Sequence, residues 1–432
     1  MPFASYRAVL RAPHACRTFG AALLGRLSYG MVSLSLLLAV KDATGSYRAA
    51  GAVTALFGVA SVSLSPVRAR LVDRYGPRRA LVPMAGAYAA LLAALAGLTW
   101  SPGAGATALG ALAMAAGCCT PPLGPVMRAL WSTLVPDRLM LQRAYSLDGV
   151  AEELLFVSGP LLVGLLLPVA GAASGLAASG ALILVGTLAL VSSPVARSAR
   201  GSAGTGTAGE PSGAGQPARG RGGLWSSGLL GVVVVSAGVG IGLGALDLLV
   251  VAFADQRHRS GAVPWVLAAL STGSALGGLA YGAVAWRMPG RRRLPLIAAA
   301  LAVALTAAGL APDVYVLLLL AALAGVFIAP ALTTAYLVAD ESADPAHRVR
   351  AGAWVNTALN AGTAAGSAAV GLLVGRLPVA WCFALVAAPV LLSAAAVGVR
   401  GPGRGWSRPR RGARTGAPPR TAAGPETEVA RT

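Results

Sequence analysis

Residues 226–253 read SSGLLGVVVVSAGVGIGLGALDLLVVAF, a run in which Asp247 is the one charged side chain. An α-helix needs about 20 apolar residues to cross the roughly 30 Å hydrocarbon core of a bilayer. A stretch of this length and composition therefore predicts a membrane-spanning helix. It decides the class of fold, because lipid is the solvent in which so apolar a surface is stable.

The rest of the chain repeats this pattern. Apolar residues make up 56% of the 432 residues and charged residues 12%, whereas a soluble domain carries about 25% charge. We predict an all-α integral membrane protein with twelve transmembrane helices, of which the ninth and tenth are separated only by Pro312 and Asp313. The spans are expected at approximately 18–40, 47–67, 80–100, 105–127, 144–168, 172–193, 226–253, 262–286, 294–311, 313–338, 351–375 and 378–399.

The basic residues define an orientation. The net charge is +20, and the cations are 34 arginines and Lys41. With the N-terminus in the cytoplasm, inside segments hold 29 of them and outside loops five, which is the bias of the positive-inside rule. We expect a multi-pass protein of the plasma membrane with both termini cytoplasmic. The cations lie in short clusters between apolar runs, which argues against binding to nucleic acid.

Composition also predicts the domains. Residues 194–224 are rich in Gly, Ser, Ala and Pro and should be a flexible cytoplasmic linker. The linker separates a six-helix bundle at 18–193 from a second at 225–399. Residues 1–17 should form a cytoplasmic tail, and residues 400–432 a disordered basic tail that is also cytoplasmic.

The two halves resemble each other. Residues 69–79 read ARLVDRYGPRR and residues 282–292 read GAVAWRMPGRR, a shift of 213. With a shift of 207, Gly159 falls on Gly366. Six spans in each half make these parallel repeats, and secondary transporters built from parallel repeats bind substrate near the midplane between the halves.

The first of these loops resembles a family signature. Asp73-Arg74-Tyr75-Gly76-Pro77-Arg78-Arg79 is similar to the GxLxDRxGRR loop of the major facilitator superfamily. The resemblance covers residues 18–399 and departs from the pattern at Ala69, at Pro77 and, in the second copy, at Trp286. It implies twelve helices, transport by alternating access and, with arginine in such excess over lysine, an actinobacterial type of protein.

In that family the loop acts as a conformational latch between the halves. The resemblance assigns this role here to Asp73, Arg74, Gly76, Arg78 and Arg79. Asp73 would meet the positive N-terminal end of a neighbouring helix and an arginine of its own loop. For the arginines the alternative is that they only enforce topology. The first copy should carry the function, and the second copy, without its acid, could be topological only.

Span five carries a second resemblance. Residues 158–164 read SGPLLVG and are similar to the GPxxGG antiporter motif of drug/proton exporters. Gly159, Pro160 and Gly164 would then serve as hinge and packing residues, since glycine and proline permit close approach and bending. The alternative is ordinary packing glycines.

Charges inside the spans point to function. Each costs about 2.5–3.5 kcal/mol at a helix centre, and the candidates for proton coupling or cavity lining are Arg26, Arg128, Glu152, Glu153 and Asp247. Desolvation favours the neutral form of a carboxyl group, so either glutamate could take up and release a proton. The alternatives are a structural pair of one glutamate with Arg26, or cavity lining without titration.

The remaining candidates also have more than one interpretation. Asp247 could be a second proton site, a binder of a cationic substrate or a partner of Arg26, which could itself contact an anionic substrate. Arg128 lies near enough to the interface to snorkel. Asn356 and Asn360 in span eleven could bind substrate or only neighbouring helices.

Together these features predict a secondary active transporter, most simply a proton-coupled exporter of a small molecule. The alternatives are an importer or uniporter of a metabolite, or a membrane sensor without transport. We expect no enzymatic activity, no cofactor and no metal, because the four cysteines and three histidines have no metal-ligand spacing. The expected partners are a small-molecule substrate, protons and lipid, and the expected state is a monomer.

Overall fold

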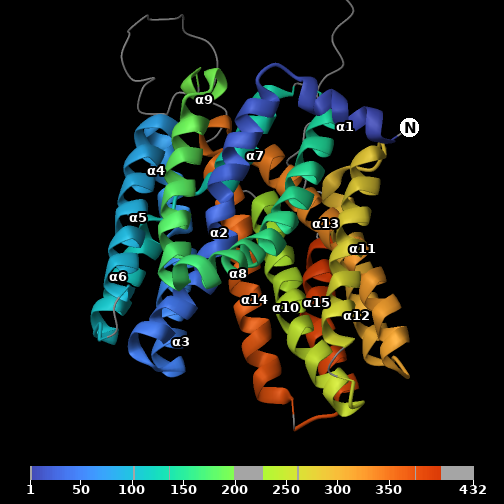
Figure 1. Ribbon diagram of the computed structural model, residues 1–432. Coiled ribbons are helices and arrows are strands. Elements are labelled where there is room, and N and C mark those ends of the chain that lie inside the picture. Colours follow the sequence, from blue (N-terminus) through green and yellow to red (C-terminus); the bar gives the residue numbers. More distant parts are fainter. Residues whose placement is uncertain are drawn as a thin grey trace, which may run out of the picture.

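The computed structural model describes residues 2–100, 103–135, 137–198, 227–259, 262–374 and 376–399. Within these ranges the chain is almost entirely helical. Figure 1 shows two groups of helices side by side, the N-terminal one coloured blue to green and the C-terminal one yellow to red. The tail predicted at 400–432 and most of the linker predicted at 194–224 lie outside the described residues.

The N-terminal half contains the six predicted spans together with two short helices. Its helices are α1 (Pro2–Arg11), α2 (Ala15–Thr44), α3 (Tyr47–Ser63), α4 (Ser65–Tyr75), α5 (Pro77–Thr99), α6 (Ala106–Cys119), α7 (Leu123–Leu134), α8 (Arg138–Val191) and α9 (Pro194–Ser198). Short α9 occupies the first residues of the predicted linker. Both α1 and α9 lie at the upper end of the molecule in Figure 1, which we call the α1 end.

The C-terminal half is built from six long helices. They are α10 (Ser227–Gln256), α11 (Val263–Ala283), α12 (Gly290–Gly309), α13 (Val314–Ser342), α14 (Arg348–Leu373) and α15 (Val379–Val399). A 3-10 turn at Pro345–His347 connects α13 to α14.

These helices make the predicted number of crossings. Among the described residues, nine helical segments, with α6 and α7 counted together, are long and apolar enough to span a membrane alone, and α3 with α4 forms another that bends by 43°. Because Gly171 has φ 70° and ψ 174°, it breaks α8 into two spans. The remaining crossing is α14, whose Asn, Ser and Thr residues lower its hydropathy. The predicted fold, twelve transmembrane helices in two parallel six-helix repeats, is confirmed.

The boundary between the ninth and tenth spans lies where the sequence predicts it. Asp313 caps α13, because its side chain accepts hydrogen bonds from the backbone N–H groups of Tyr315 and Val316, both at 2.9 Å. These N–H groups have no partner within the helix. One acidic residue after Pro312 is therefore enough to end one crossing and begin the next.

Glycine permits an equivalent close helix pair in each half. In the N-terminal half α2 packs on α8, and a Cβ atom on Gly159 would overlap the backbone of Gly30. In the C-terminal half α10 packs on α14, and a Cβ atom on Gly366 would overlap the backbone of Ile241. Gly159 and Gly366 are the positions that the 207-residue shift aligns, so the repeat in the sequence is a repeated helix contact in the structure.

We predict that Gly159→Leu destabilises the protein by about 1–3 kcal/mol, because the new side chain forces α2 and α8 apart. The matched control is Gly164→Leu on the same helix, where a Cβ atom would meet nothing within 4 Å. Thermal unfolding in detergent should show a lower midpoint for the Gly159 variant only. Equal midpoints for the two variants would contradict the packing account.

Candidate functional site

A cavity of about 570 Å³ lies between the two halves, within the size range of sites for drug-sized ligands. Helices of both halves line it: α2, α3, α4, α7 and α8 on one side, and α10, α13 and α14 on the other. Predicted site residues among its lining are Arg128, Glu152, Glu153, Asn356 and Asn360.

Four charged side chains form a cluster beside this cavity, the ion quartet of Arg26, Arg128, Asp148 and Glu152, in which only Glu152 is partly exposed, at 30%. Arg26 contacts Asp148 at 2.6 Å and Glu152 at 3.0 Å. Arg128 contacts Asp148 at 3.0 Å and also hydrogen-bonds Glu152. The quartet joins α2, α7 and α8, and its two cations and two anions leave no net charge.

Two tyrosines enclose the quartet. The hydroxyl of Tyr145 donates to the backbone oxygen of Arg128 at 3.0 Å. The ring of Tyr336, from α13 of the other half, lies 3.8 Å from the Arg128 guanidinium carbon, a cation–π contact. The Tyr336 hydroxyl reaches Asn356 on α14 at 3.4 Å. The quartet therefore touches both halves of the protein.

Glu153 is in a different environment from its neighbour. Ser274 of α11 donates a hydrogen bond to its Oε1 atom across the interface between the halves. Its Oε2 atom is buried without a hydrogen-bond partner, and no described cation lies within ion-pair distance. Adjacent positions on one helix thus give one carboxylate held by two arginines and one held by a single neutral hydroxyl group.

A further cation lies in the wall of the cavity. Arg68, in α4, is only 6% exposed and donates hydrogen bonds to the backbone oxygens of Ser61, Gly117 and Cys118. No described carboxylate lies within ion-pair distance of it. Arg68 directly follows the predicted end of span two at residue 67, so from its position it would be expected to lie in a loop. The signal that it is buried would have been its place on the cavity face of a span that continues to Tyr75.

The halves are joined at the α1 end through two pairs of helices. Between α4 and α14, the Asp73 carboxylate accepts a hydrogen bond from the backbone N–H of Arg350 at 3.0 Å. Between α8 and α11, Gln142 donates to the backbone oxygens of Tyr281 at 2.9 Å and Val284 at 3.0 Å. An exposed ion pair of Arg138 and Glu341, at 2.6 Å, adds a third connection.

The short helix α1 reinforces this closure. Its Tyr6 hydroxyl donates to the backbone oxygen of Leu279 in α11 at 2.5 Å. Burial raises the pKa of Tyr6 to about 12, although the nearby Arg143 acts in the opposite direction. The hydroxyl group therefore keeps its proton at neutral pH and remains a donor.

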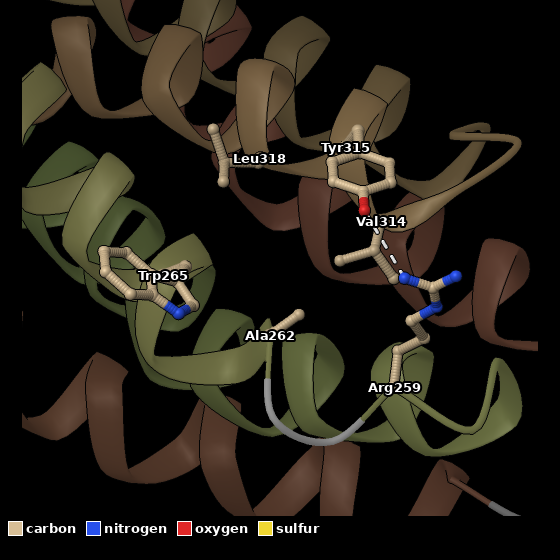
Figure 2. A pocket seen from close by; sticks show the side chains of 6 residues that line it. All are labelled: Arg259, Ala262, Trp265, Val314, Tyr315 and Leu318. Carbon is tan, nitrogen blue, oxygen red and sulfur yellow. Dashed lines mark hydrogen bonds between the residues drawn. The ribbon is translucent and has the colours of Figure 1, made fainter.

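A second, shallower hollow of about 380 Å³ lies at the opposite end, between the starts of α11 and α13 (Figure 2). In it Arg259 donates a hydrogen bond to the Tyr315 hydroxyl at 3.4 Å. Trp265 and Tyr315 are about 70% exposed, as is usual for aromatic rings at a membrane–water interface. None of the described residues that line this hollow is a buried polar side chain.

Comparison with known proteins decides the family. The sequence pattern described as the Major Facilitator Superfamily matches residues 18–263 and 241–426. The chain belongs to the major facilitator superfamily. A comparison with curated protein sequences finds no match.

Solved structures of transporters of this superfamily share the fold. The human organic anion transporter MFSD10 (TETRAN) is similar with a TM-score of 0.68 and 17% identity over 91% of this chain and 99% of that one. A bacterial homologue of the iron transporter ferroportin, in an outward-facing state with soaked iron, gives 0.67 and 15% over 89% and 97%. The proton:xylose symporter XylE gives 0.66 and 13% over 89% and 95%. Identities this low concern the fold alone.

Within the superfamily signature, Asp73 meets the start of a helix of the other half, as the sequence predicts. Arg350, the residue whose N–H it binds, is the third residue of α14, so the carboxylate meets the positive end of a helix. Gly76 permits the turn into α5 with φ 82° and ψ 160°. The expected bond between Asp73 and a loop arginine is not formed: Arg74, Arg78 and Arg79 are all exposed, and none pairs with a described acid.

The second copy of the signature differs physically from the first. At the position of the missing acid, Trp286 donates its indole N–H to the backbone oxygen of Tyr281 at 3.1 Å. Contact with the other half is made instead by the Gln142 amide described above. Here an amide bonded to backbone oxygens joins the halves, in place of a carboxylate.

Two expectations about partners were wrong. Arg26 does not pair with Asp247, because both Arg26 contacts go to the acids of α8. Asp247 is exposed on α10, one helical turn from Leu243, which lines the cavity. The snorkelling alternative for Arg128 also fails, since this side chain is 5% exposed and turned towards the acids.

The two glycines of the span-five motif differ in their contacts. Gly159 lies against Gly30, whereas Gly164 has open space around its Cα atom. Pro160 follows Gly159 within α8 without breaking that helix, and the break comes later, at Gly171. A hinge role for Pro160 and Gly164 stays a prediction.

We predict that Asp148→Ala destabilises the protein by about 3–5 kcal/mol, because it leaves Arg26 and Arg128 with half of their compensating charge. Thermal unfolding of the purified protein would measure this. The matched control is Asp42→Ala, which breaks the exposed pair with Lys41, 3.4 Å long, and should cost about 1 kcal/mol or less. If the two variants unfold at the same temperature, the quartet does not hold α2, α7 and α8 together.

Proposed function

We propose that the protein is a secondary active transporter that works by alternating access and exports a small molecule in exchange for protons. The observation that carries the proposal is the pairing of the cavity with Glu153, a carboxyl group without a cation that bridges the two halves through Ser274. A proton on this group would change the one hydrogen bond between the halves that, among the described residues, reaches the cavity lining.

The arrangement of contacts supports an outward-open state. Among the described residues, the hydrogen bonds and ion pairs between the halves lie at the α1 end, apart from the Glu153–Ser274 bond in the cavity. With the N-terminus in the cytoplasm, as the positive-inside rule favours, these contacts close the cytoplasmic side. Asp73 would then act as a latch that is released when the cavity opens inwards.

Glu152 and Glu153 would have separate tasks. Glu152 is part of the neutral quartet and keeps its charge through two arginines. Glu153 would take a proton from outside, weaken its bond with Ser274 in the inward movement and release the proton into the cytoplasm. One carboxylate fixes the geometry, and the next one couples the gradient.

Export is the direction we favour, and a drug/proton antiporter is the subtype. Its support is the glycine–proline motif of span five and the acids of spans five and seven. The similar structures carry an organic anion, iron and xylose according to their names, so they support transport without selecting a cargo. The arginine-rich composition supports an actinobacterial source, and we propose a monomer in the plasma membrane.

We predict that Glu153→Gln abolishes accumulation of cargo driven by a pH gradient while downhill exchange continues. Everted membrane vesicles with an acidic interior would be assayed for uptake of fluorescein, ethidium and Nile red, an anion, a cation and a neutral dye. At least one dye should accumulate in vesicles with the native protein. Glu152→Gln should lower the amount of folded protein, because it leaves two arginines short of charge.

The comparison variant is Asp247→Asn, which removes the other candidate acid. It should retain gradient-driven uptake, because its side chain is exposed and bridges nothing between the halves. Uptake that survives both glutamate substitutions at normal expression would refute proton coupling through this site. Uptake that is lost only in Asp247→Asn would move the coupling role to α10.

A further inference from the structure

Arg68 is the one cation in the cavity wall for which the described residues supply no carboxylate within ion-pair distance. Arg128 and Glu152, the other charges of the N-terminal wall near it, belong to the neutral quartet. The ionisable groups that interact electrostatically with Arg68 are Tyr29, Cys118, Cys119 and Tyr88, and none of these is a carboxylate. A buried charge without a counter-charge is costly in a membrane, so its presence calls for an explanation.

Hydrogen bonds to backbone oxygens explain the position of Arg68, but they do not neutralise its positive charge. Nη1 donates to Gly117 at 2.5 Å and Cys118 at 3.1 Å, and Nη2 donates to Ser61 at 2.5 Å. The first two oxygens lie at the end of α6, where span four is interrupted before α7 begins, and they carry partial negative charge. These bonds hold the guanidinium in one orientation. Its Nε–H remains buried without a partner.

The surroundings of Arg68 suit a ligand that is partly polar. Hydroxyl groups of Tyr29, Ser33, Thr54 and Ser65 line the same wall, and the Thr54 oxygen is buried without a partner. Further lining is apolar, from side chains of both halves: Phe57, Val62, Phe156, Leu243, Ile328 and Leu332. A fixed cation beside hydroxyl groups and an apolar surface fits a carboxylate attached to an apolar body.

We propose that Arg68 binds the negatively charged group of the substrate, and that the cargo is a small organic carboxylate with an apolar body. This inference rests on the proposed transport function and adds the class of cargo. Arg26, considered above as a contact for an anion, is occupied by Asp148 and Glu152 and cannot serve. Arg68 takes that place on α4.

An anionic cargo also fits the coupling. When a carboxylate leaves the cell and a proton enters, both movements transfer charge in the direction that an inside-negative membrane potential favours. Arg68 and Glu153 lie on separate helices, so each can hold its own ligand in the same cavity. Export of the anion would therefore respond to the membrane potential as well as to the pH gradient.

The test is equilibrium binding of radiolabelled 4-phenylbutyrate to the full chain in detergent. Its amine and alcohol analogues, 4-phenylbutylamine and 4-phenylbutanol, serve as competitors with the same body and different charge. We expect saturable binding that unlabelled carboxylate displaces and the two analogues do not. Arg68→Gln should weaken binding about 10- to 100-fold, the range for loss of a charged hydrogen-bond partner.

The matched control is Arg70→Gln, which removes the same charge from an exposed position on the same helix and should bind as the native protein does. Because Arg68 also caps the end of α6, Arg68→Lys is the second variant: it keeps the charge and should keep the preference for carboxylate over amine. The preference for carboxylate over amine can also be measured on the native protein, without any substitution.

The proposal is overturned if the amine or the alcohol competes as well as the carboxylate, if Arg68→Gln binds normally, or if no saturable binding of the carboxylate occurs. Failure of the transport function would look different. In that case the carboxylate would bind in an Arg68-dependent way, while no dye would accumulate in everted vesicles under a pH gradient. Gradient-driven uptake without carboxylate binding would leave the function intact and refute the cargo.

Discussion

The structure depends on the need to balance charge away from water. Two arginines and two acids lie side by side within the N-terminal half, and each alone would cost about 2.5–3.5 kcal/mol at the centre of a membrane helix. As a neutral cluster they hold α2, α7 and α8 together through ion pairs. Tyr145 and Tyr336, which line the cavity, both contact Arg128 of that cluster.

In the function that we propose, proton and substrate act on the charges that the cluster leaves out. Glu153 follows Glu152 directly but points to the other half, where Ser274 offers only a hydroxyl group. Arg68 is held by backbone oxygens, and no described acid lies within ion-pair distance of it. The two uncompensated groups lie in the wall of one cavity, so a proton and an anion can each find a partner there. The contacts at the α1 end are hydrogen bonds of Asp73 at the start of α14 and of the Gln142 amide. Such bonds are weaker than the ion pairs of the quartet and can be exchanged during a transport cycle.

Sequence alone predicted the helices well, because a span is a local property of some 20 residues. It also predicted that Asp73 meets a helix N-terminus, since the signature places an acid at the end of a span, beside the start of a neighbouring helix. It could not decide between Glu152 and Glu153, because partners depend on the rotation of each helix against its neighbours. The pairing of Arg26 with Asp247 was wrong for that reason. Arg68 was missed because a charge near a span end is counted as loop until the bend between α3 and α4 is known.

The most direct test of this division between balanced and unbalanced acids is infrared difference spectroscopy of the purified protein during a pH step. A carboxyl group that gains a proton acquires a C=O stretching band distinct from that of a carboxylate. The account predicts a band that Glu153→Gln removes and Glu152→Gln leaves in place. A band that persists in Glu153→Gln and disappears in Glu152→Gln would show that the proton resides on the quartet, and would contradict the account.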